Sequence, residues 1–191
     1  MTAGAASHEA TLGDKELKGG NAQKAMAHYN KALELDDSNA EIYIKRATGY
    51  MVTGKTSKAN KDLDLALTLD PQNLKAILKR ARVRRQQGLF DDAVADYEAA
   101  GAIEPGNAKV AKELPQVAQA RKAQDQGRQS FEKAVAALDS GDSTNAKRLF
   151  GQAHFNLGNA LKAAPDSPDN LAMDARVRHP PHLLLTESAQ K

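Results

Sequence analysis

The sequence contains no cysteine and no tryptophan. The absence of cysteine excludes disulfide bonds, thiolate zinc sites and cysteine nucleophiles, and it fits a reducing compartment. Aromatic residues make up only 4% of the 191 residues, and the net charge is only +3. Such a small net charge does not indicate a protein that binds nucleic acid through its overall charge. Because alanine is abundant and β-branched residues are sparse, the composition favours helices over sheets.

The sequence also lacks the signals of secretion and membrane insertion. The first residues, MTAGAASHEATLGDKELKGG, have no basic segment followed by an apolar one, as a secretory signal would. No apolar run approaches the roughly 20 residues that a membrane helix needs. We therefore expect a soluble cytoplasmic protein with no membrane partner. The endoplasmic reticulum is the alternative location if the chain is a fragment of a longer protein.

What the sequence does have is a similar segment that recurs every 34 residues. YNKALELDDSN, LDLALTLDPQN and YEAAGAIEPGN end at Asn39, Asn73 and Asn107. This spacing defines three units in phase, at 6–39, 40–73 and 74–107. In each unit, position 8 is small, position 15 is Gly, and positions 20 and 27 are Ala. Position 24 is Tyr29, Leu63 and Tyr97, and position 32 is Asp37, Pro71 and Pro105.

These shared positions predict a pair of antiparallel helices in every unit. Small residues at positions 8, 20 and 27 let the two helices approach closely. The Gly at position 15 allows the left-handed turn between them, and Pro near position 32 ends the second helix. The first helices are expected at 7–19, 40–53 and 74–87, and the second helices at 22–36, 56–69 and 90–103. Each pair leaves an apolar face that only a neighbouring unit can bury.

The pattern continues in weaker form after Asn107. With Gly141 at position 15, the residues at positions 8, 20, 24 and 27 are Ala134, Ala146, Phe150 and Ala153. We interpret 127–164 as a degenerate fourth unit with a long second helix, and 108–126 as a linking helix. Pro115 is expected to kink or delimit that linking helix. Residues 1–5 are expected to be disordered, and 165–191 to be an incomplete repeat or a tail.

The 34-residue period with this pattern of small residues resembles the tetratricopeptide repeat (TPR). The resemblance covers about 6–164 and implies an all-α TPR superhelix, an α-solenoid of antiparallel helix pairs. It also implies that the first helices line a concave groove, to which positions 2, 5, 6, 9, 12 and 13 contribute. No constellation of catalytic, phosphate-binding or metal-binding residues is visible in the sequence. We therefore expect no enzyme, no cofactor and no metal site.

Basic residues crowd the groove positions of the third unit. The segment from Lys75 to Arg85 holds six basic residues and no acidic one. A basic and partly apolar groove suits an acidic or carboxylate-ended peptide. The alternative is that these charges only balance the acidic second helices. The predicted peptide-binding residues are Lys45, Lys75, Lys79, Arg82 and Arg85 for charge, and Ile44, Met51 and Leu78 for apolar contact.

The units resemble those of TPR co-chaperones, many of which grip the acidic tail of large chaperones with a carboxylate clamp. The clamp has Lys, Asn, Asn, Lys and Arg at five positions, which correspond here to Ala10, Asp14, Lys45, Lys75 and Lys79. Only Lys75 matches, and Lys79 keeps the charge of the Arg. Asp14 is expected to repel a carboxylate.

A closer likeness is to J-domain co-chaperones, whose TPR units hold unfolded clients. YIKRATGYMVTGKTSKA and ILKRARVRRQQGLFDDA carry the similarity, although the chain has no His-Pro-Asp motif of a J domain. We therefore predict a co-chaperone-like interaction module whose partner is a chaperone peptide or an unfolded client segment. One alternative is nucleic-acid binding through the basic helix 75–85, which the shortage of aromatic groove residues disfavours. Another alternative is a self-associating assembly scaffold.

Overall fold

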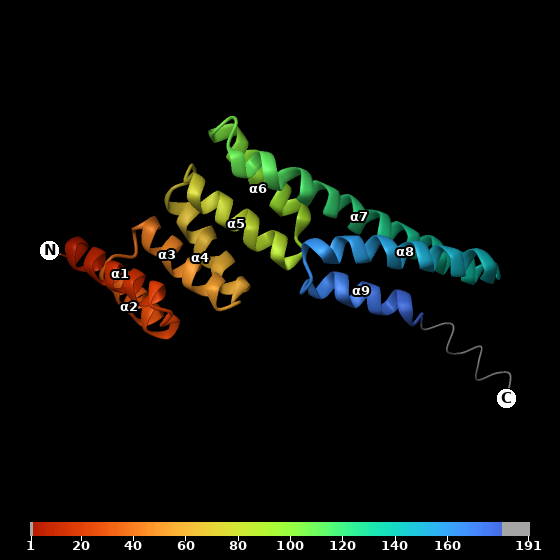
Figure 1. The fold of residues 1–191 in the computed structure, drawn as a ribbon, viewed down its shortest axis with the longest axis horizontal. Helices are drawn as coiled ribbons and strands as arrows, with labels where there is room; N and C mark the ends of the chain where they lie inside the picture. The colour runs from red at the N-terminus through yellow and green to blue at the C-terminus, as the bar shows by residue number, and fades with distance from the viewer. Residues whose placement is uncertain (1, 181–191) are drawn as a thin grey trace. The chain divides into compact units, whose positions relative to one another are not determined.

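The computed structural model describes residues 2–180, and all regular structure in this range is helical (Figure 1). The predicted all-α solenoid of helix pairs is confirmed. The first three pairs are α1 (Thr2–Lys18) with α2 (Ala22–Leu35), α3 (Ala40–Val52) with α4 (Thr56–Leu69), and α5 (Leu74–Gln87) with α6 (Phe90–Ile103). The remaining helices are α7 (Ala108–Asp139), α8 (Ser143–Ala163) and α9 (Pro168–Arg178).

The described residues divide into two compact units, each larger than a 34-residue repeat, which are called the first unit and the second unit from here on. The first consists of residues up to 84 together with 95–110, so it contains α1 to α4 and most of α5 and α6. The second consists of 85–94 and the residues from 111 onward, so it contains the turn after α5, most of α7, and α8 and α9. Each unit has its own interior.

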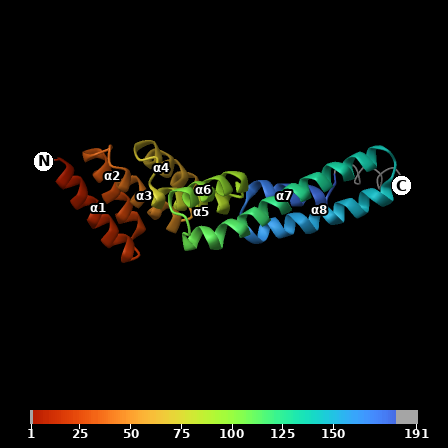
Figure 2. The same ribbon diagram turned by 90° about the horizontal axis from the view of Figure 1, so that it is seen from above.

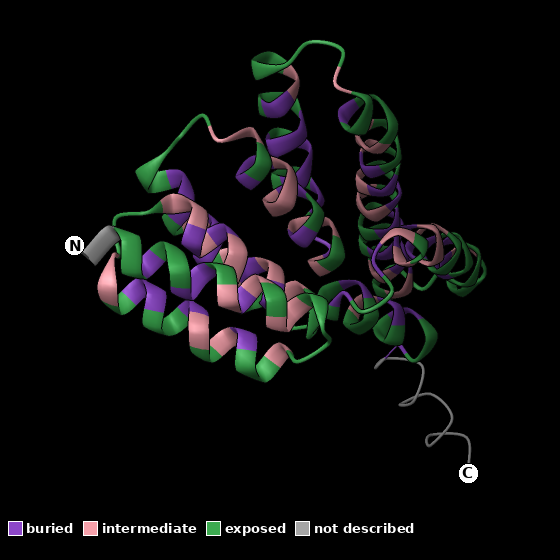
Figure 3. Ribbon diagram, turned by 60° about the vertical axis from the view of Figure 1, so that its left-hand side comes forward, coloured by how far each residue is buried: buried purple, intermediate pink, exposed green. Residues whose placement is uncertain are grey.

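The small residues of the repeat form the interior of the first unit. Every alanine at positions 20 and 27 of the three in-phase repeats is fully buried. Buried residues run as stripes along the helices (Figure 3). The ring of Tyr29 fills the space beside Gly13, where an added Cβ would lie 2.5 Å from the ring. Close approach of α1 and α2 therefore depends on a residue without a side chain at this position.

Glycine and asparagine set the ends of the helices. The position-15 glycines Gly20, Gly54, Gly88 and Gly141 all have positive φ, between 70° and 83°, which glycine adopts without strain. The asparagine that ends each repeat caps the next helix. The Oδ1 atoms of Asn39, Asn73 and Asn107 accept backbone N–H groups in the first turn of that helix. The invariant Asn of the repeat thus has a local structural cause.

An arginine at position 7 joins helices in the second and third repeats. Arg46 donates from Nε and Nη2 to the carboxylate of Asp62, both at 2.8 Å. Arg80 donates in the same way to Asp96, at 3.1 and 2.7 Å. Because Asp62 and Asp96 are buried, these bidentate pairs fix the helices of a repeat against each other. Each arginine also binds position 25 of the preceding repeat, which is Asn30 for Arg46 and Asp64 for Arg80.

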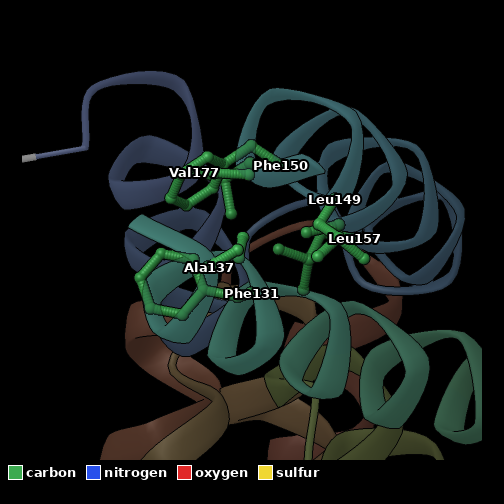
Figure 4. Close-up of a cluster of buried hydrophobic side chains, with 9 residues drawn as sticks. Phe131, Ala137, Leu149, Phe150, Leu157 and Val177 are labelled. Carbon is green, nitrogen blue, oxygen red and sulfur yellow. The ribbon is translucent and has the colours of Figure 1, made fainter. Parts of the chain in front are cut away.

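The second unit has a core made by α7, α8 and α9. Helices α7 and α8 run antiparallel beside each other (Figure 2). Phe131 of α7 meets Phe150 of α8 edge to face, with ring centroids 5.8 Å apart, and Val177 of α9 joins them (Figure 4). An added Cβ on Gly127 would lie 2.7 Å from Leu157 Cγ, so this glycine permits close packing of the two helices.

A polar cluster attaches the start of α9 to the turn after α5. Ser167, the N-cap of α9, is fully buried, and its side chain packs directly on Gly88. Gln124 of α7 donates to Asn170 Oδ1 at 2.7 Å and to the Gly88 carbonyl at 3.3 Å. Farther along α9, the buried Asp174 accepts from Arg178 and contacts His154 Nδ1 at 2.6 Å. Buried polar groups therefore hold α9 at its start, and Asp174 joins its middle to α8.

The structure differs from the sequence-based expectations at two places, and it covers a third expectation in part. Helix α1 begins at Thr2, so the predicted disorder of residues 2–5 is wrong; this segment is rich in alanine, which extends the helix. Pro115 does not delimit a helix, since α7 runs through it without a break from the linking segment into the fourth repeat. Residues 165–191 were expected to be an incomplete repeat or a tail; they contain the helix α9, and 181–191 lie outside the described residues.

Candidate functional site

The basic side chains between Lys75 and Arg85 are mostly paired. Arg80 and Arg84 both donate to Asp96, at distances between 2.7 and 3.1 Å. Lys75 Nζ binds Glu41 Oε1 at 2.5 Å, and Arg85 Nη1 lies 3.1 Å from Glu113 Oε2. For Arg80 and Arg84, the alternative interpretation from the sequence, that the charges balance the acidic second helices, describes what the structure contains. Lys75 and Arg85 pair instead with carboxylates of α3 and α7.

Lys79 and Arg82 are the two basic residues of this segment for which the described part of the chain provides no ion pair. They lie three residues apart on one face of α5. Arg82 is exposed and Lys79 is half-buried. Burial lowers the pKa of the Lys79 ammonium group, and the charges of Lys75 and Arg82 lower it further. The charge of Glu41, which is paired with Lys75, opposes this lowering. A partly desolvated cation with no ion pair of its own therefore lies on the groove helix of the third repeat.

Asp14 is not the isolated negative charge that the sequence suggested. Its carboxylate forms an ion pair with Lys45 and accepts a hydrogen bond of 2.8 Å from the Tyr29 hydroxyl. The expected repulsion of a carboxylate ligand is therefore reduced by a counter-ion. Since a lysine ammonium group has three N–H donors, Lys45 retains donors beyond the one that Asp14 accepts.

The predicted apolar contacts divide into buried and accessible residues. Ile44 is fully buried, so its assignment to the ligand surface is wrong; it belongs to the interior of the first unit. Leu78 and Met51 are half-buried and keep part of their side chains accessible. Val52, which follows Met51 at the end of α3 and also stands at a groove position of the repeat, is 67% exposed.

Arg85 belongs to the second unit, whereas the other seven predicted residues belong to the first. It lines a cavity of about 770 Å³ together with residues of α7 and α8. The structure therefore brings the charges of α1, α3 and α5 together in the first unit and assigns Arg85 to a different surface. Within residues 2–180, no cluster of three or more potential metal ligands occurs, and none of the helices there could cross a bilayer.

The site of the first unit is suited to the binding of a charged ligand. It combines two ion pairs, Asp14 with Lys45 and Glu41 with Lys75, with the uncompensated Lys79 and Arg82. Accessible parts of Met51, Val52 and Leu78 add apolar surface on the same helices. An anionic group with an apolar neighbour matches these features in charge and in polarity.

Comparison with known proteins identifies the repeat. A family model described as a TPR repeat matches residues 13–54. No curated protein matches the chain. The predicted resemblance to TPR domains is confirmed by the solved structures that follow.

The first TPR of Spaghetti (RPAP3), bound to the HSP90 peptide SRMEEVD, is 28% identical with a TM-score of 0.61, covering 63% of this chain and 95% of that one. The second TPR domain of human RPAP3, in complex with the HSP70 peptide SGPTIEEVD, is 29% identical with a TM-score of 0.58, covering 61% and 98%. The Arabidopsis OM64 TPR domain is 26% identical with a TM-score of 0.60, covering 62% and 98%. The fold of this chain is a TPR solenoid.

Proposed function

We propose that the chain is a non-catalytic interaction module, co-chaperone-like, whose first unit binds the acidic C-terminal segment of a partner protein. The observation that carries the proposal is the pair of cations, Lys79 and Arg82, that the described residues leave without a counter-ion. The other four basic residues of the segment have acidic partners. A charge that contributes no ion pair within the protein is available to one outside it.

The lowered pKa of Lys79 relates this observation to the free energy of ligand binding. Burial and two neighbouring cations lower its pKa, so the charged form of this side chain is disfavoured in the unliganded protein. A carboxylate placed beside Lys79 would remove that penalty and form a charge-assisted hydrogen bond. The arrangement thus destabilises the unliganded protein slightly and favours the complex, as expected of a ligand site.

The peptides in the similar structures have the chemistry that this site requires. SRMEEVD and SGPTIEEVD both end in EEVD, which combines acidic side chains with one apolar residue. Lys75 and Lys79 would meet the carboxylates, and the remaining donors of Lys45 would replace the amide donor that a clamp has at this position. Leu78, Met51 and Val52 offer apolar surface to the valine.

Nucleic-acid binding through residues 75–85 has less support. Such binding depends on the number of cations that can contact phosphates, and four of the six in this segment are already paired with carboxylates. The groove positions of the first unit also carry no aromatic side chain on which a base could stack.

The test is binding of fluorescein-labelled SRMEEVD to the intact chain, measured by fluorescence polarisation at low and high salt. Lys79→Met removes the charge but keeps an apolar side chain, and it should weaken binding about tenfold or more. Arg82→Glu should weaken it further by repulsion. Lys24→Met on α2, an exposed lysine away from these positions, is the matched control and should change nothing.

A second peptide separates the two predicted kinds of partner. An unfolded apolar segment should bind weakly, and its binding should not change in Lys79→Met. Equal affinity of wild type, Lys79→Met and Arg82→Glu for SRMEEVD would refute the acidic-peptide function. Apolar-segment binding that persists in salt and falls in Met51→Ser would instead assign the unit to client binding.

A further inference from the structure

The cavity of about 770 Å³ in the second unit is a separate candidate binding site. It is lined by the end of α5, the middle of α7 and the C-terminal half of α8, all within the second unit. Its volume falls within the range of about 300–1,000 Å³ that ligand sites usually have. None of the seven predicted groove residues of the first unit contributes to it.

The charge of the cavity lining has one sign. Arg85, Lys122 and Lys162 line it, and no Asp or Glu does. Arg85 pairs with Glu113 through Nη1, yet its buried Nε–H has no acceptor among the residues that the structure describes. Lys162 donates to the neutral amide of Asn159, and no described carboxylate forms an ion pair with Lys122. The cavity lining is therefore cationic and suits an anionic ligand.

Amide side chains make up most of the remaining polar lining. On α7 they recur at the spacing of one helix face, and a second row lies on α8. Because each amide carries both donors and acceptors, two such rows can bind the N–H and C=O groups of an extended peptide. The alanines between them leave the floor open. The amide residues are Gln116, Gln119 and Gln126 on α7, and Asn156 and Asn159 on α8.

An exposed aromatic residue completes the lining. Phe155 of α8 is 69% exposed, although the whole sequence has only four phenylalanines. Aromatic side chains dominate the energetics of interfaces because they bury large apolar area with few rotatable bonds. At the edge of a cationic cavity, Phe155 offers a contact for an apolar side chain of the same ligand.

We propose that this cavity binds an internal acidic peptide segment in extended form, with an apolar side chain against Phe155. The acidic residues meet Lys122, Arg85 and Lys162, and the amide rows bind the peptide backbone. A phosphate ion fits less well, because it would leave the amide rows and Phe155 without a partner. The chain would then hold two acidic segments, one in each unit.

The test uses a fluorescein-labelled peptide GDEFDEG with both ends blocked, titrated onto the intact chain. Blocking the C-terminus removes the terminal carboxylate but leaves the acidic side chains, so variants of the cavity lining must distinguish cavity binding from binding to the first unit. Lys122→Glu and Phe155→Ala should each weaken binding about tenfold. Both side chains are exposed, so neither variant should disturb the fold, which circular dichroism checks.

Matched variants locate the binding. Lys133→Glu, an exposed lysine on α7 outside the cavity, and Lys24→Met, an exposed lysine on α2, should leave affinity for GDEFDEG unchanged. The isosteric peptide GNQFNQG should bind at least about tenfold more weakly. The proposal is overturned if GDEFDEG does not bind, if Lys122→Glu and Phe155→Ala bind it as wild type does, or if a short oligothymidine binds there in its place with steep salt dependence.

Discussion

Replacing Gly88 by alanine tests how α9 is held in the second unit. Gly88 is buried with φ of +77°, and an added Cβ would lie 2.7 Å from Ser167 Cβ and closer still to Ser167 Oγ. Gly141 occupies the same repeat position in the same unit with φ of +83°, but nothing lies within 4 Å of its added Cβ. The two glycines therefore share a backbone conformation and differ in packing.

The expected losses follow from this difference. An L-residue in the left-handed region costs roughly 1–2 kcal/mol, and the lower entropy of the unfolded chain offsets about 0.4–1 kcal/mol of that. Gly141→Ala should therefore lower the free energy of unfolding by about 1 kcal/mol. Gly88→Ala should add an overpacking cost of about 1–3 kcal/mol, because the buried Ser167 has no space to move into.

A second substitution isolates the packing contribution. Ser167→Gly removes the two nearest atoms that meet the new methyl group and leaves Asn170 Nδ2 at 3.3 Å. Glycine is nearly as good an N-cap as serine, with a loss of only about 0.3 kcal/mol. In the Ser167→Gly background, Gly88→Ala should therefore cost about as much as Gly141→Ala. Urea unfolding followed by far-ultraviolet circular dichroism measures the free energies, and hydrogen exchange reports whether α9 loses protection.

The reasoning fails if Gly88→Ala and Gly141→Ala cost the same in the wild-type background. It also fails if Ser167→Gly does not reduce the cost of Gly88→Ala, because the excess would then come from another contact. Loss of protection in α9 alone, with α7 and α8 unchanged, would be the direct signature of the Gly88–Ser167 contact.

Three further predictions concern buried polar groups. Asp96→Ala leaves two guanidinium groups without their buried acceptor and should lower the free energy of unfolding, measured in urea, by about 3–5 kcal/mol. Lys75→Ala breaks an exposed ion pair and should lower it by only about 0–1 kcal/mol. Similar losses for the two variants would contradict the conclusion that burial makes the Asp96 pairs the stronger ones. Although burial raises it, hydrogen bonds from Arg178 and His154 hold the pKa of Asp174 below its ordinary value of 3.8. The stability from Asp174 is therefore present above that pH and lost as pH falls through the lowered value, so Asp174→Asn should flatten the acid limb of a thermal-stability profile. Burial and the hydrogen bond to Asp14 raise the pKa of Tyr29 above its ordinary value of 10.0. Its contribution is present below pH 10.0 and lost at higher pH, and Tyr29→Phe should abolish a late step in the tyrosinate absorbance titration.

The sequence predicted the helix pairs because their determinants are local. Gly54 and Gly88 allow the turn within a repeat, Asn39 and Asn73 cap the next helix, and the alanines between them specify close packing. Each of these residues acts within a few positions of its own place in the chain. A fixed period therefore gave the helix bounds to within a few residues for most of the first unit.

The site was harder to predict because it depends on side chains that come together from different helices. Which cations remain uncompensated could not be known without the positions of Asp96, Glu41 and Glu113. Ile44 was misassigned because position 5 was treated as a groove position. That position holds the apolar residues Ala10, Ile44 and Leu78 in the three repeats. This shared apolar character was the available signal that Ile44 is buried.

The continuity of α7 shows where a local rule was overridden. A proline inside a helix removes one backbone hydrogen bond and usually costs about 3 kcal/mol or more. Pro115 is exposed, while Val110 and Val117 on either side of it are buried, so packing of the flanking turns maintains the helix. Gly127 in the same helix packs against Leu157 and does not mark a turn.

The polar cluster that joins Gly88 to Ser167 also bears on how the chain is completed during synthesis. The contacts of the first unit form between segments that are neighbours in sequence, so this unit can fold while the chain is still emerging from the ribosome. The turn after α5, by contrast, acquires its partners Gln124, Ser167 and Asn170 only much later in translation. The second unit should therefore be the last to acquire protection on the nascent chain, and only once α9 has been made.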